Sequence, residues 1–418
     1  MGRYARTLLI AFAVWLVGFG GFTFLVDPYG LMPGVQIPGV NERRTRAHED
    51  GYRVRTGHRL LDTEAGTIIM GSSRVADGYP RDIPDWEGGF ENLGMAGTTA
   101  FELARASTLA AGNPDIRCVI IGMDLREFGT EPNAHATYWL TPLAGGPRLF
   151  ADIRMLLSLS AFARAMQTLT DNITGGSDTR WEHAYDEDIL RERFEEEISK
   201  RYRGYSTYEY DPERMRFLFR GVDALLAEGK QVVFIIHPVH VWQEEAGYRA
   251  GVNDEEYALR RDAVRHLAAR SEAEAERPCF DGPALQVWDF GGYQPVSLTA
   301  PPDWDGEGPN PWYYVPAHYR PALGQAVLDR LRGREREAPV SADMFGYRLT
   351  PDTLDEVLAA REARREAWLA SGGEWMDYVS GEFDALDENP PPPERDARHY
   401  LNRDNWNQLE RDVRRHGG

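Results

Sequence analysis

The sequence has little cysteine. Its 418 residues include only Cys118 and Cys279, which are too few for a disulfide framework. Cys118 lies inside the apolar run of residues 117–121, so we expect it to pack as a small apolar side chain. A single disulfide bridge is the alternative if the chain folds in an oxidising compartment.

The chain also lacks an excess of positive charge. Lysine and arginine total 47 against 66 aspartate and glutamate residues, which gives a formal net charge of -19. Nucleic-acid binders need a basic face that neutralises phosphates, so we predict no nucleic-acid partner. The apolar fraction of 42% is sufficient for a packed core and excludes a disordered chain.

Only one long apolar run is present. It extends without charge from Leu8 to Val26, just long enough to cross the hydrocarbon core as a helix of about 20 residues. Arg3 and Arg6 precede it and no Lys or Arg follows until Arg43, which predicts a cytoplasmic N-terminus. We expect an uncleaved anchor in the inner membrane with the main domain in the periplasm or outside the cell. The alternative is a buried N-terminal core helix.

Beyond this segment, short β-branched runs alternate with helical patterns, which is typical of a parallel sheet with crossover helices. We expect strands at residues 67–70, 117–122, 231–236 and 285–290, with one more ending at residue 92. We expect helices at 98–111, 213–228, 253–275, 321–331 and 353–369. Asn253 and Glu256 predict a capping box at the start of the third helix.

The predicted organisation has four parts. Residues 1–27 form the transmembrane anchor, 28–61 a linker and arm, 62–335 the main α/β domain, and 336–418 a charged, partly helical extension that we expect to be peripheral. The α/β rhythm stops at residues 129–212, which we interpret as a helical insert. It is either a lid over the strand ends or a helical excursion with no substrate role.

Polar motifs stand where the predicted strands end. They are Gly-Ser-Ser-Arg at 71–74, Asn-Leu-Gly-Met-Ala-Gly-Thr-Thr at 92–99, Gly-Met-Asp at 122–124, and Ala-His-Tyr at 317–319 before a late helix. The carboxyl ends of parallel strands meet at one edge, where ligands bind in open α/β sheets. His237, His240 and Asp289 lack the spacing of a closed zinc site, so we predict no metal and no cofactor.

In this order the motifs resemble the SGNH/GDSL hydrolase superfamily. The resemblance covers roughly residues 66–332 in patches and is strongest to membrane-anchored bacterial members similar to alginate O-acetyltransferase and cell-wall acylation proteins. It implies a three-layer α/β/α fold with a mainly parallel, flavodoxin-like sheet. It also implies a serine ester hydrolase or O-acyltransferase that acts on a cell-envelope polysaccharide, with an acyl-donor protein as a further partner.

The resemblance places the nucleophile at Ser73 and the general base at His318. It places oxyanion donors at the backbone N–H groups of Ser73 and Gly97. Ser72 competes for the nucleophile role, and we expect it instead to cap or support the turn. Arg74 and His240 are predicted supporting residues, with His240 lining the crevice or bonding a loop carbonyl.

Two positions depart from the family pattern. Asp124 replaces an Asn donor, and an ionised carboxylate only accepts hydrogen bonds. Val315 replaces the acid three residues before the histidine, so either Asp289 substitutes for it or Ser73 and His318 act as a dyad. These departures favour the alternative function, a catalytically inactive SGNH-like scaffold that binds glycan or supports an envelope assembly. The aromatic residues Trp304, Trp312, Tyr313 and Tyr314 suit either a sugar face or packing.

Overall fold

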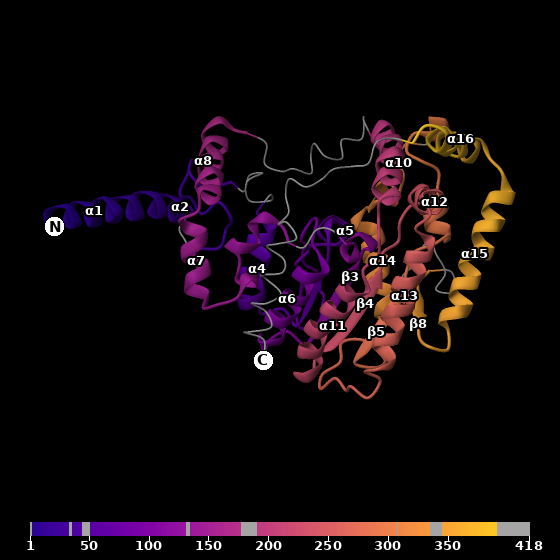
Figure 1. Cartoon of the computed structure of the whole chain (residues 1–418), viewed down its shortest axis with the longest axis horizontal. Helices are drawn as coiled ribbons and strands as arrows, with labels where there is room; N and C mark the ends of the chain where they lie inside the picture. Colours follow the sequence, from indigo (N-terminus) through magenta and orange to yellow (C-terminus); the bar gives the residue numbers. More distant parts are fainter. Residues whose placement is uncertain are drawn as a thin grey trace. The chain divides into compact units, whose positions relative to one another are not determined.

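The computed structural model forms two compact units (Figure 1). It describes residues 2–32, 36–43, 51–130, 134–176, 190–306, 308–334 and 345–390. Unit 1 comprises Met1–Asp62 and Ala136–Asp186, and unit 2 comprises Thr63–His135 and Glu187–Gly418. Parts of the predicted insert 129–212 and of the extension 336–418 lie outside the described residues.

Unit 2 contains a six-stranded sheet with the order β2-β1-β3-β4-β5-β8. The strands are β1 (Thr67–Met70), β2 (Phe90–Asn92), β3 (Cys118–Met123), β4 (Gln231–Ile236), β5 (Leu285–Asp289) and β8 (Tyr347–Leu349). Strands β1 to β5 are parallel, and β8 is antiparallel to β5. The prediction of an α/β fold with a mainly parallel sheet is therefore confirmed.

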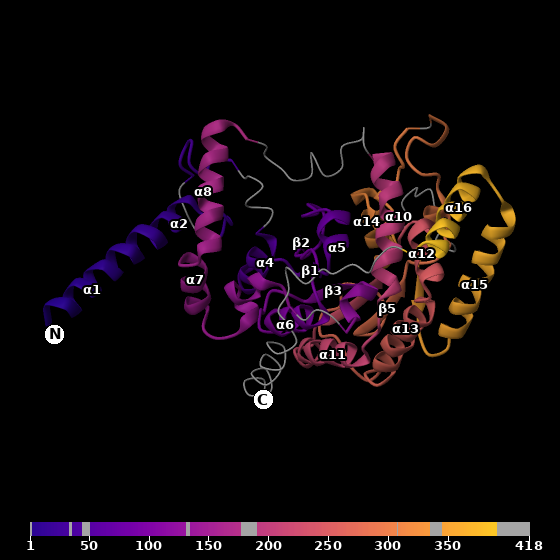
Figure 2. The same ribbon diagram turned by 45° about the horizontal axis from the view of Figure 1, so that its top comes forward.

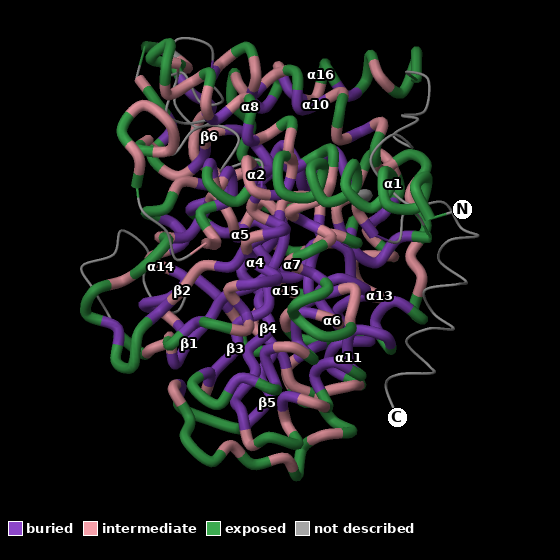
Figure 3. The backbone as a smooth tube through the Cα atoms, turned by 90° about the vertical axis from the view of Figure 1, so that its left-hand side faces the viewer, coloured by how far each residue is buried: buried purple, intermediate pink, exposed green. Residues whose placement is uncertain are grey.

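The central strands are buried on both faces. Every residue of β1, β3 and β4 is buried, as the purple stretches of these strands show in Figure 3. Ile69 pairs with Ile120, and Ile120 pairs with Val233, so a row of β-branched side chains crosses the middle of the sheet. Burial on both faces explains why these strands are continuously apolar rather than alternating.

Helices connect and cover the strands of unit 2. They are α5 (Ser73–Gly78), α6 (Ala100–Ala111), α10 (Leu190–Ser206), α11 (Pro212–Ala227), α12 (Val241–Ala250), α13 (Asn253–Ala268), α14 (Pro321–Leu331), α15 (Leu354–Ser371) and α16 (Glu374–Glu388). Helix α6 packs on α11, α11 contacts β4, and α13 contacts β5. The capping box predicted at Asn253 is wrong, because α13 starts after Val252 without a side-chain cap, and it ends at Ala268 rather than residue 275.

The parallel strands have the order of a flavodoxin-like doubly wound sheet, 2-1-3-4-5. In this order the chain leaves β1 towards one side to form β2 and later returns to the other side of β1 to form β3. The loops after β1 and β3 therefore diverge, and ligands bind in the crevice between them in such sheets. Ser73 follows β1 and Asp124 follows β3 at this place.

The described part of the C-terminal extension, residues 345–390, is part of the fold of unit 2, contrary to the predicted peripheral position. Strand β8 adds to the sheet edge, with Leu349 opposite Val287 of β5. Helix α15 places Arg361, which is only 3% exposed, against Glu244 of α12. Trp368 of α15 also lies in the apolar core. This packing was not visible in the sequence because the helix surface is rich in charge.

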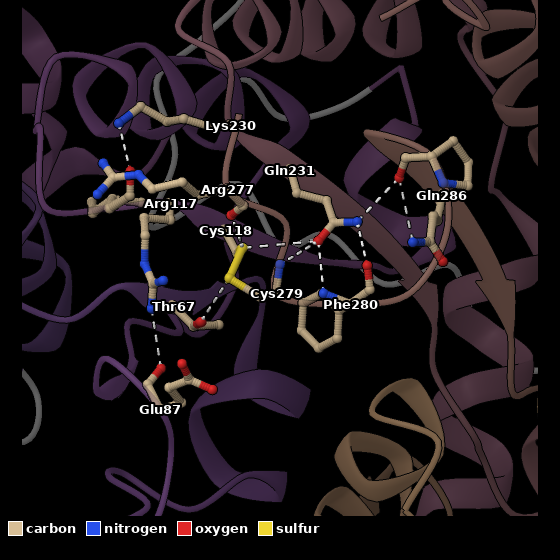
Figure 4. The surroundings of a disulfide bond; sticks show 12 residues. Thr67, Glu87, Arg117, Cys118, Lys230, Gln231, Arg277, Cys279, Phe280 and Gln286 are labelled. Carbon is tan, nitrogen blue, oxygen red and sulfur yellow. Dashed lines mark hydrogen bonds between the residues drawn. A yellow bond between two sulfur atoms is a disulfide. The ribbon is translucent and has the colours of Figure 1, made fainter. Parts of the chain in front are cut away.

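A disulfide joins Cys118 of β3 to Cys279, with their Cα atoms 6.2 Å apart (Figure 4). Cys118 is fully buried, as apolar packing predicted, but it forms the single bridge that was the alternative from the sequence. Beside the bridge, Gln231 Oε1 accepts hydrogen bonds from the backbone N–H groups of Cys279 and Phe280, each at 2.9 Å. The bridge and Gln231 together fix the segment before β5 to the centre of the sheet.

Unit 1 begins with a continuous helical segment made of α1 (Gly2–Trp15), the π-helix η1 (Leu16–Gly20) and α2 (Gly21–Val26). This N-terminal helix is long and apolar enough to cross a membrane, with a mean hydropathy of 2.2 in its most apolar window. Most of that window is exposed, since only 17% of it is buried. A buried core helix, the alternative considered from the sequence, does not fit this exposure.

The remaining helices of unit 1 form a small core beside the N-terminal helix. They are α4 (Tyr52–Asp62), α7 (Arg148–Leu156), α8 (Leu159–Thr174) and the short 3-10 turns η3 (Ala136–Leu140) and η4 (Pro142–Ala144). Tyr29, Val54, Met155 and Ala161 make up its buried apolar cluster. The predicted insert is thus divided, because α7 and α8 belong to unit 1 whereas α10 belongs to unit 2.

We expect Gly94→Ala to destabilise unit 2. Gly94 lies in the turn after β2, and a Cβ there would be 2.3 Å from the backbone nitrogen of Ala76 in α5. Either the turn or the helix that starts at Ser73 must then shift, and such overpacking costs about 1–3 kcal/mol. Thermal unfolding should show a Tm several degrees below wild type.

Gly112→Ala is the matched control, because the nearest atom to its Cβ is the carbonyl oxygen of Leu109 at 3.5 Å. This variant should keep the wild-type Tm. Equal Tm values for the two variants would contradict the close packing of the turn at Gly94 against α5.

Candidate active site

The turn after β1 presents two serines in different roles. Ser72 is the N-cap of α5, and its Oγ accepts a hydrogen bond from the backbone N–H of Arg74 at 3.2 Å. Ser73 is then the first helical residue, so its own backbone N–H has no acceptor within the helix. The predicted capping role of Ser72 is therefore what the structure shows.

Ser73 and His318 lie within hydrogen-bond distance, with Oγ 2.8 Å from Nε2. His318 belongs to β7 (His318–Tyr319), which pairs antiparallel with β6 (Tyr313–Val315) just before α14. Both side chains are half-buried at the carboxyl edge of the sheet. If Nε2 is the unprotonated ring nitrogen, it accepts a hydrogen bond from the hydroxyl group of Ser73. This is the geometry that proton transfer from a serine requires.

An ion pair between Arg74 and Asp124 joins the ends of β1 and β3. Asp124 Oδ1 accepts a hydrogen bond from Arg74 Nη1, and Oδ2 accepts one from the hydroxyl of Ser72. Arg74 Nε also donates to the carbonyl oxygen of Ala317 at 2.9 Å, next to His318. Arg74 thus links the histidine loop to the serine turn, and Asp124, both of whose oxygens are engaged, fixes Arg74 and Ser72 to the end of β3.

The glycine turn after β2 is tied to the serine turn. The backbone N–H of Met95 donates to the carbonyl oxygen of Gly71 at 2.7 Å, and Asn92 Nδ2 donates to the carbonyl oxygen of Val75 at 2.8 Å. Gly97 follows with a φ of 64°, a value that favours glycine. The oxyanion role of the backbone N–H groups of Gly97 and Ser73 stays a prediction.

The surroundings of His318 lower its pKa to about 3. Burial is the largest cause, followed by the positive charges of Arg201 and Arg74. The carboxylates of Glu197 and Asp124 act in the opposite direction. The imidazole is therefore neutral near pH 7, as a proton acceptor must be. The same low pKa means that the imidazolium formed by proton transfer is disfavoured.

Negative charge in this region is concentrated on Asp124. Burial opposes its ionisation, but attraction to Arg74 and His237 and the hydrogen bond from Ser72 hold its pKa below the ordinary value. Burial and the charge of Asp124 raise the pKa of the neighbouring Glu127 well above its usual range. Asp124 is therefore the ionised partner of Arg74, and ionisation of the neighbouring Glu127 is disfavoured.

Glu197 on α10 is a functional candidate that the sequence analysis missed. It accepts hydrogen bonds from Lys200 Nζ at 2.6 Å and from Arg201 Nε at 2.7 Å. Burial opposes its ionisation, but Arg201 and Lys200 lower its pKa to about 2, and His318 acts in the same direction. In the sequence these residues show only helical charge spacing, which is typical of a solvated face.

Two predicted supporting residues have other partners. Asp289 at the end of β5 accepts a hydrogen bond from Arg260 Nε at 2.7 Å, so the idea that it orients His318 is wrong. A buried carboxylate without a charged partner is costly, which accounts for this pairing. His240 caps α12, and its Nε2 lies 2.8 Å from the carbonyl oxygen of Thr299. This is the loop-carbonyl role, one of the two predicted for it.

A small cavity of about 40 Å³ with a mixed polar and apolar lining lies beside Arg74, large enough for a few water molecules. Arg74, His237 and Arg260 are among its lining residues. His237 Nδ1 lies 2.8 Å from the hydroxyl of Tyr319, and Nε2 has no hydrogen-bond partner among the described residues. Burial lowers the pKa of His237 to about 4. A neutral His237 therefore adds a polar neighbour to the ion pair without a competing charge.

No model of a known protein family matches this sequence, and no curated protein matches it either. Inferences about its function therefore depend on its own residues and their geometry.

We expect His318 to titrate far below the usual histidine range. Hydrogen exchange at the imidazole C2 position, followed by mass spectrometry, should give a midpoint well under the value near 6.5 of an unfolded histidine. Because its folded pKa is depressed, His318 stabilises the fold above pH 6.5, and this contribution is lost as the pH falls towards 3. Arg201→Gln should raise the midpoint by removing a positive charge. A wild-type midpoint near 6.5 would contradict this electrostatic picture.

Proposed function

We propose that this chain is a serine enzyme with an SGNH-like fold, either an O-acyl esterase or an O-acyltransferase. Ser73 is the nucleophile and His318 is the general base. The 2.8 Å approach of Ser73 Oγ to His318 Nε2 carries the proposal. The position of the two residues also supports the proposal, because they lie at the carboxyl edge of a parallel sheet where the loops after β1 and β3 diverge.

In the proposed reaction, Ser73 Oγ bonds to the carbonyl carbon of an ester while its proton passes to His318 Nε2. When the tetrahedral intermediate collapses, the bond from carbon to the alcohol oxygen breaks and His318 returns the proton to the leaving alcohol. Water then attacks the acyl-enzyme in an esterase, and an acceptor hydroxyl attacks it in a transferase. Both attacks use His318 as a base again, and the bond from carbon to Ser73 Oγ then breaks as His318 returns the proton to that oxygen. Glu197, whose charge opposes the low pKa of His318, stabilises the imidazolium formed at each step.

We assign the oxyanion role to the backbone N–H groups of Ser73 and Gly97. The first belongs to the open N-terminal turn of α5, and the second belongs to a turn bonded to the serine turn. Asp124 has no donor to offer while it is ionised. Arg74 is a positioning residue, because it bonds both Asp124 and the carbonyl oxygen next to the histidine.

We also propose that the N-terminal helix anchors the chain in the inner membrane with unit 2 in the periplasm. Arg3 and Arg6 at its start favour a cytoplasmic N-terminus. The disulfide between Cys118 and Cys279 is of a kind that persists in oxidising compartments, which supports the same orientation.

A cell-envelope polysaccharide is the proposed substrate class, with an acyl-donor protein as the further partner in a transferase. The family resemblance supports this choice. The aromatic residues before His318 add little, because they have packing roles. Tyr313 is fully buried, the guanidinium of Arg191 stacks on Trp304 at 4.2 Å, and that of Arg320 stacks on Tyr314 at 4.5 Å.

A fluorophosphonate probe, which reacts with activated serine hydroxyls, should label the full-length protein at Ser73. Ser73→Ala should abolish labelling, and His318→Ala should reduce its rate by orders of magnitude because the base is missing. The double variant should be no worse than Ser73→Ala, since the two residues act as one unit. Ser72→Ala is the matched control and should be labelled at a rate close to wild type.

The variant Asp124→Asn tests whether Asp124 anchors Arg74 and Ser72 or only occupies the position of an oxyanion donor. The amide cannot accept hydrogen bonds from both Arg74 and Ser72 as the carboxylate does, and breaking a buried ion pair typically costs about 3–5 kcal/mol. We expect at least a tenfold loss of kcat on a small activated ester, together with a lower Tm. Turnover equal to or faster than wild type would instead support an oxyanion position that an Asn donor improves.

The second candidate function is a catalytically inactive SGNH-like scaffold that binds glycan or supports an envelope assembly. The low pKa of His318 favours it, because a base with a pKa of about 3 has little driving force to hold a proton. Equal fluorophosphonate labelling of wild type and Ser73→Ala would reject the enzyme and leave this function.

A further inference from the structure

Exposed apolar side chains are concentrated in unit 1. Outside the N-terminal helix, the described residues include only one large exposed apolar side chain in unit 2, Leu369. The others all lie between residues 139 and 173, and they are Trp139, Leu149, Phe150, Ile153, Leu159, Met166 and Ile173. Leu159 is 79% exposed and Ile173 69% exposed. Such a concentration indicates contact with an apolar medium or partner.

On α8 these side chains form one stripe. Leu159, Met166 and Ile173 are spaced by seven residues, and two helical turns bring each back to within about 20° of the one before. Phe162 lies about 60° round the helix from Leu159, beside the same stripe. The buried side of α8 faces away from it and consists of Ala161, Ala165 and Thr168.

Phe162, beside the stripe, contacts the N-terminal helix. Its ring stacks on Phe19 with the centroids 4.3 Å apart, and it lies 5.3 Å from the ring of Phe22. Leu157, in the elbow between α7 and α8, approaches Gly20 so closely that a Cβ there would be 2.9 Å from its Cδ2. The stripe therefore faces the side on which the N-terminal helix passes. In Figures 1 and 2, α8 runs across the end of that helix rather than along it.

The depth of this contact follows from helix geometry. Helix α2 ends at Val26, and Gly20 is six residues earlier, about 9 Å along the axis. Asp27 then ends the helix in the left-handed region and accepts hydrogen bonds from the backbone N–H groups of Leu31 and Met32. If the bilayer covers the helix up to Val26, the elbow lies about 9 Å below its surface. Interfacial amphipathic helices bury their apolar face to a depth of about 5–10 Å.

We propose that α7 and α8 lie in the interface of the bilayer that the N-terminal helix spans, with their exposed apolar side chains inserted among the lipid tails. The proposal rests on the proposed membrane-spanning role of that helix and is independent of Ser73 and His318. The occupant is a lipid surface because Phe162, beside the stripe, packs on Phe19 of the proposed membrane-spanning helix, and no residue of the first segment of that helix, α1, is buried. Unit 1 is then a membrane-seated base in which α7 and α8 lie along the bilayer surface while the N-terminal helix crosses it.

The test uses single nitroxide labels on the full-length protein in phospholipid nanodiscs. The two native cysteines are paired, so one introduced cysteine is the only thiol available for labelling. Met166→Cys and Ile173→Cys place the label on the stripe. Gln167→Cys is the matched control, one residue along α8 and about 100° away from the stripe. Val14→Cys, at a 67% exposed position of α1, reports whether the N-terminal helix is in the bilayer.

Power-saturation spectra measure contact of each label with oxygen, which concentrates in lipid, and with a water-soluble nickel chelate. We expect the ratio of oxygen to nickel accessibility at Met166 and Ile173 to exceed that at Gln167 several-fold and to approach that at Val14. A lipid-like ratio at Val14 with equal ratios at Met166 and Gln167 would overturn the interfacial placement and leave the anchor standing. Aqueous ratios at all positions, Val14 included, would overturn both.

A second measurement needs no substitution. The wild-type protein in nanodiscs that contain a diazirine-bearing phosphatidylcholine is photolysed and digested, and its lipid adducts are mapped by mass spectrometry. Adducts should occur in peptides from residues 148–174 as well as 2–26. Adducts confined to residues 2–26 would contradict the proposal. The same result would be seen if a protein partner, rather than lipid, covers the stripe.

Discussion

The Arg74–Asp124 ion pair is the interaction on which the geometry of the candidate site depends. It connects the end of β1 to the end of β3, and through the carbonyl oxygen of Ala317 it also fixes the loop that carries His318. These three segments come from distant parts of the chain. Removing either charge leaves the other buried and unpaired, which is more costly than losing a surface pair. The distance between Ser73 and His318 is therefore set by a neighbour of the serine rather than by the two residues themselves.

The same ion pair places a constraint on chemistry. Arg74 anchors the histidine loop, but its positive charge, like that of Arg201, also disfavours protonation of His318. Glu197 counters this effect from α10, and its own ionisation is maintained by Arg201. A serine hydroxyl needs a neutral imidazole before attack and a stabilised imidazolium afterwards. The ground state satisfies the first requirement, and the second depends on how closely Glu197 approaches His318 when an ester occupies the site.

The sequence was informative where local pattern decides structure. Continuous β-branched runs predicted β1, β3 and β4, and the family resemblance carried by the motifs at the strand ends implied that Ser73 and His318 would be near one another. It was uninformative where distant segments meet. Strand β8 is only three residues long, which is too short for a periodic pattern to mark it. Arg260, the partner of Asp289, was not readable because a charged residue has many candidate partners until the fold selects one. Cys279 was the one candidate for a bridge with Cys118, but no sequence pattern showed that the two residues meet.

The C-terminal extension shows how far such selection reaches. Arg361 and Arg365 of α15 pair with Glu244 and Glu245 of α12, and α12 in turn packs against α10. Desolvation offsets much of the attraction within a buried ion pair, but removing one partner leaves the other charge unpaired at a large cost. These pairs therefore tie α12 to α15. Since α12 supports the helix that carries Glu197, the extension constrains the charge facing the candidate histidine, although no residue of the extension needs to touch it.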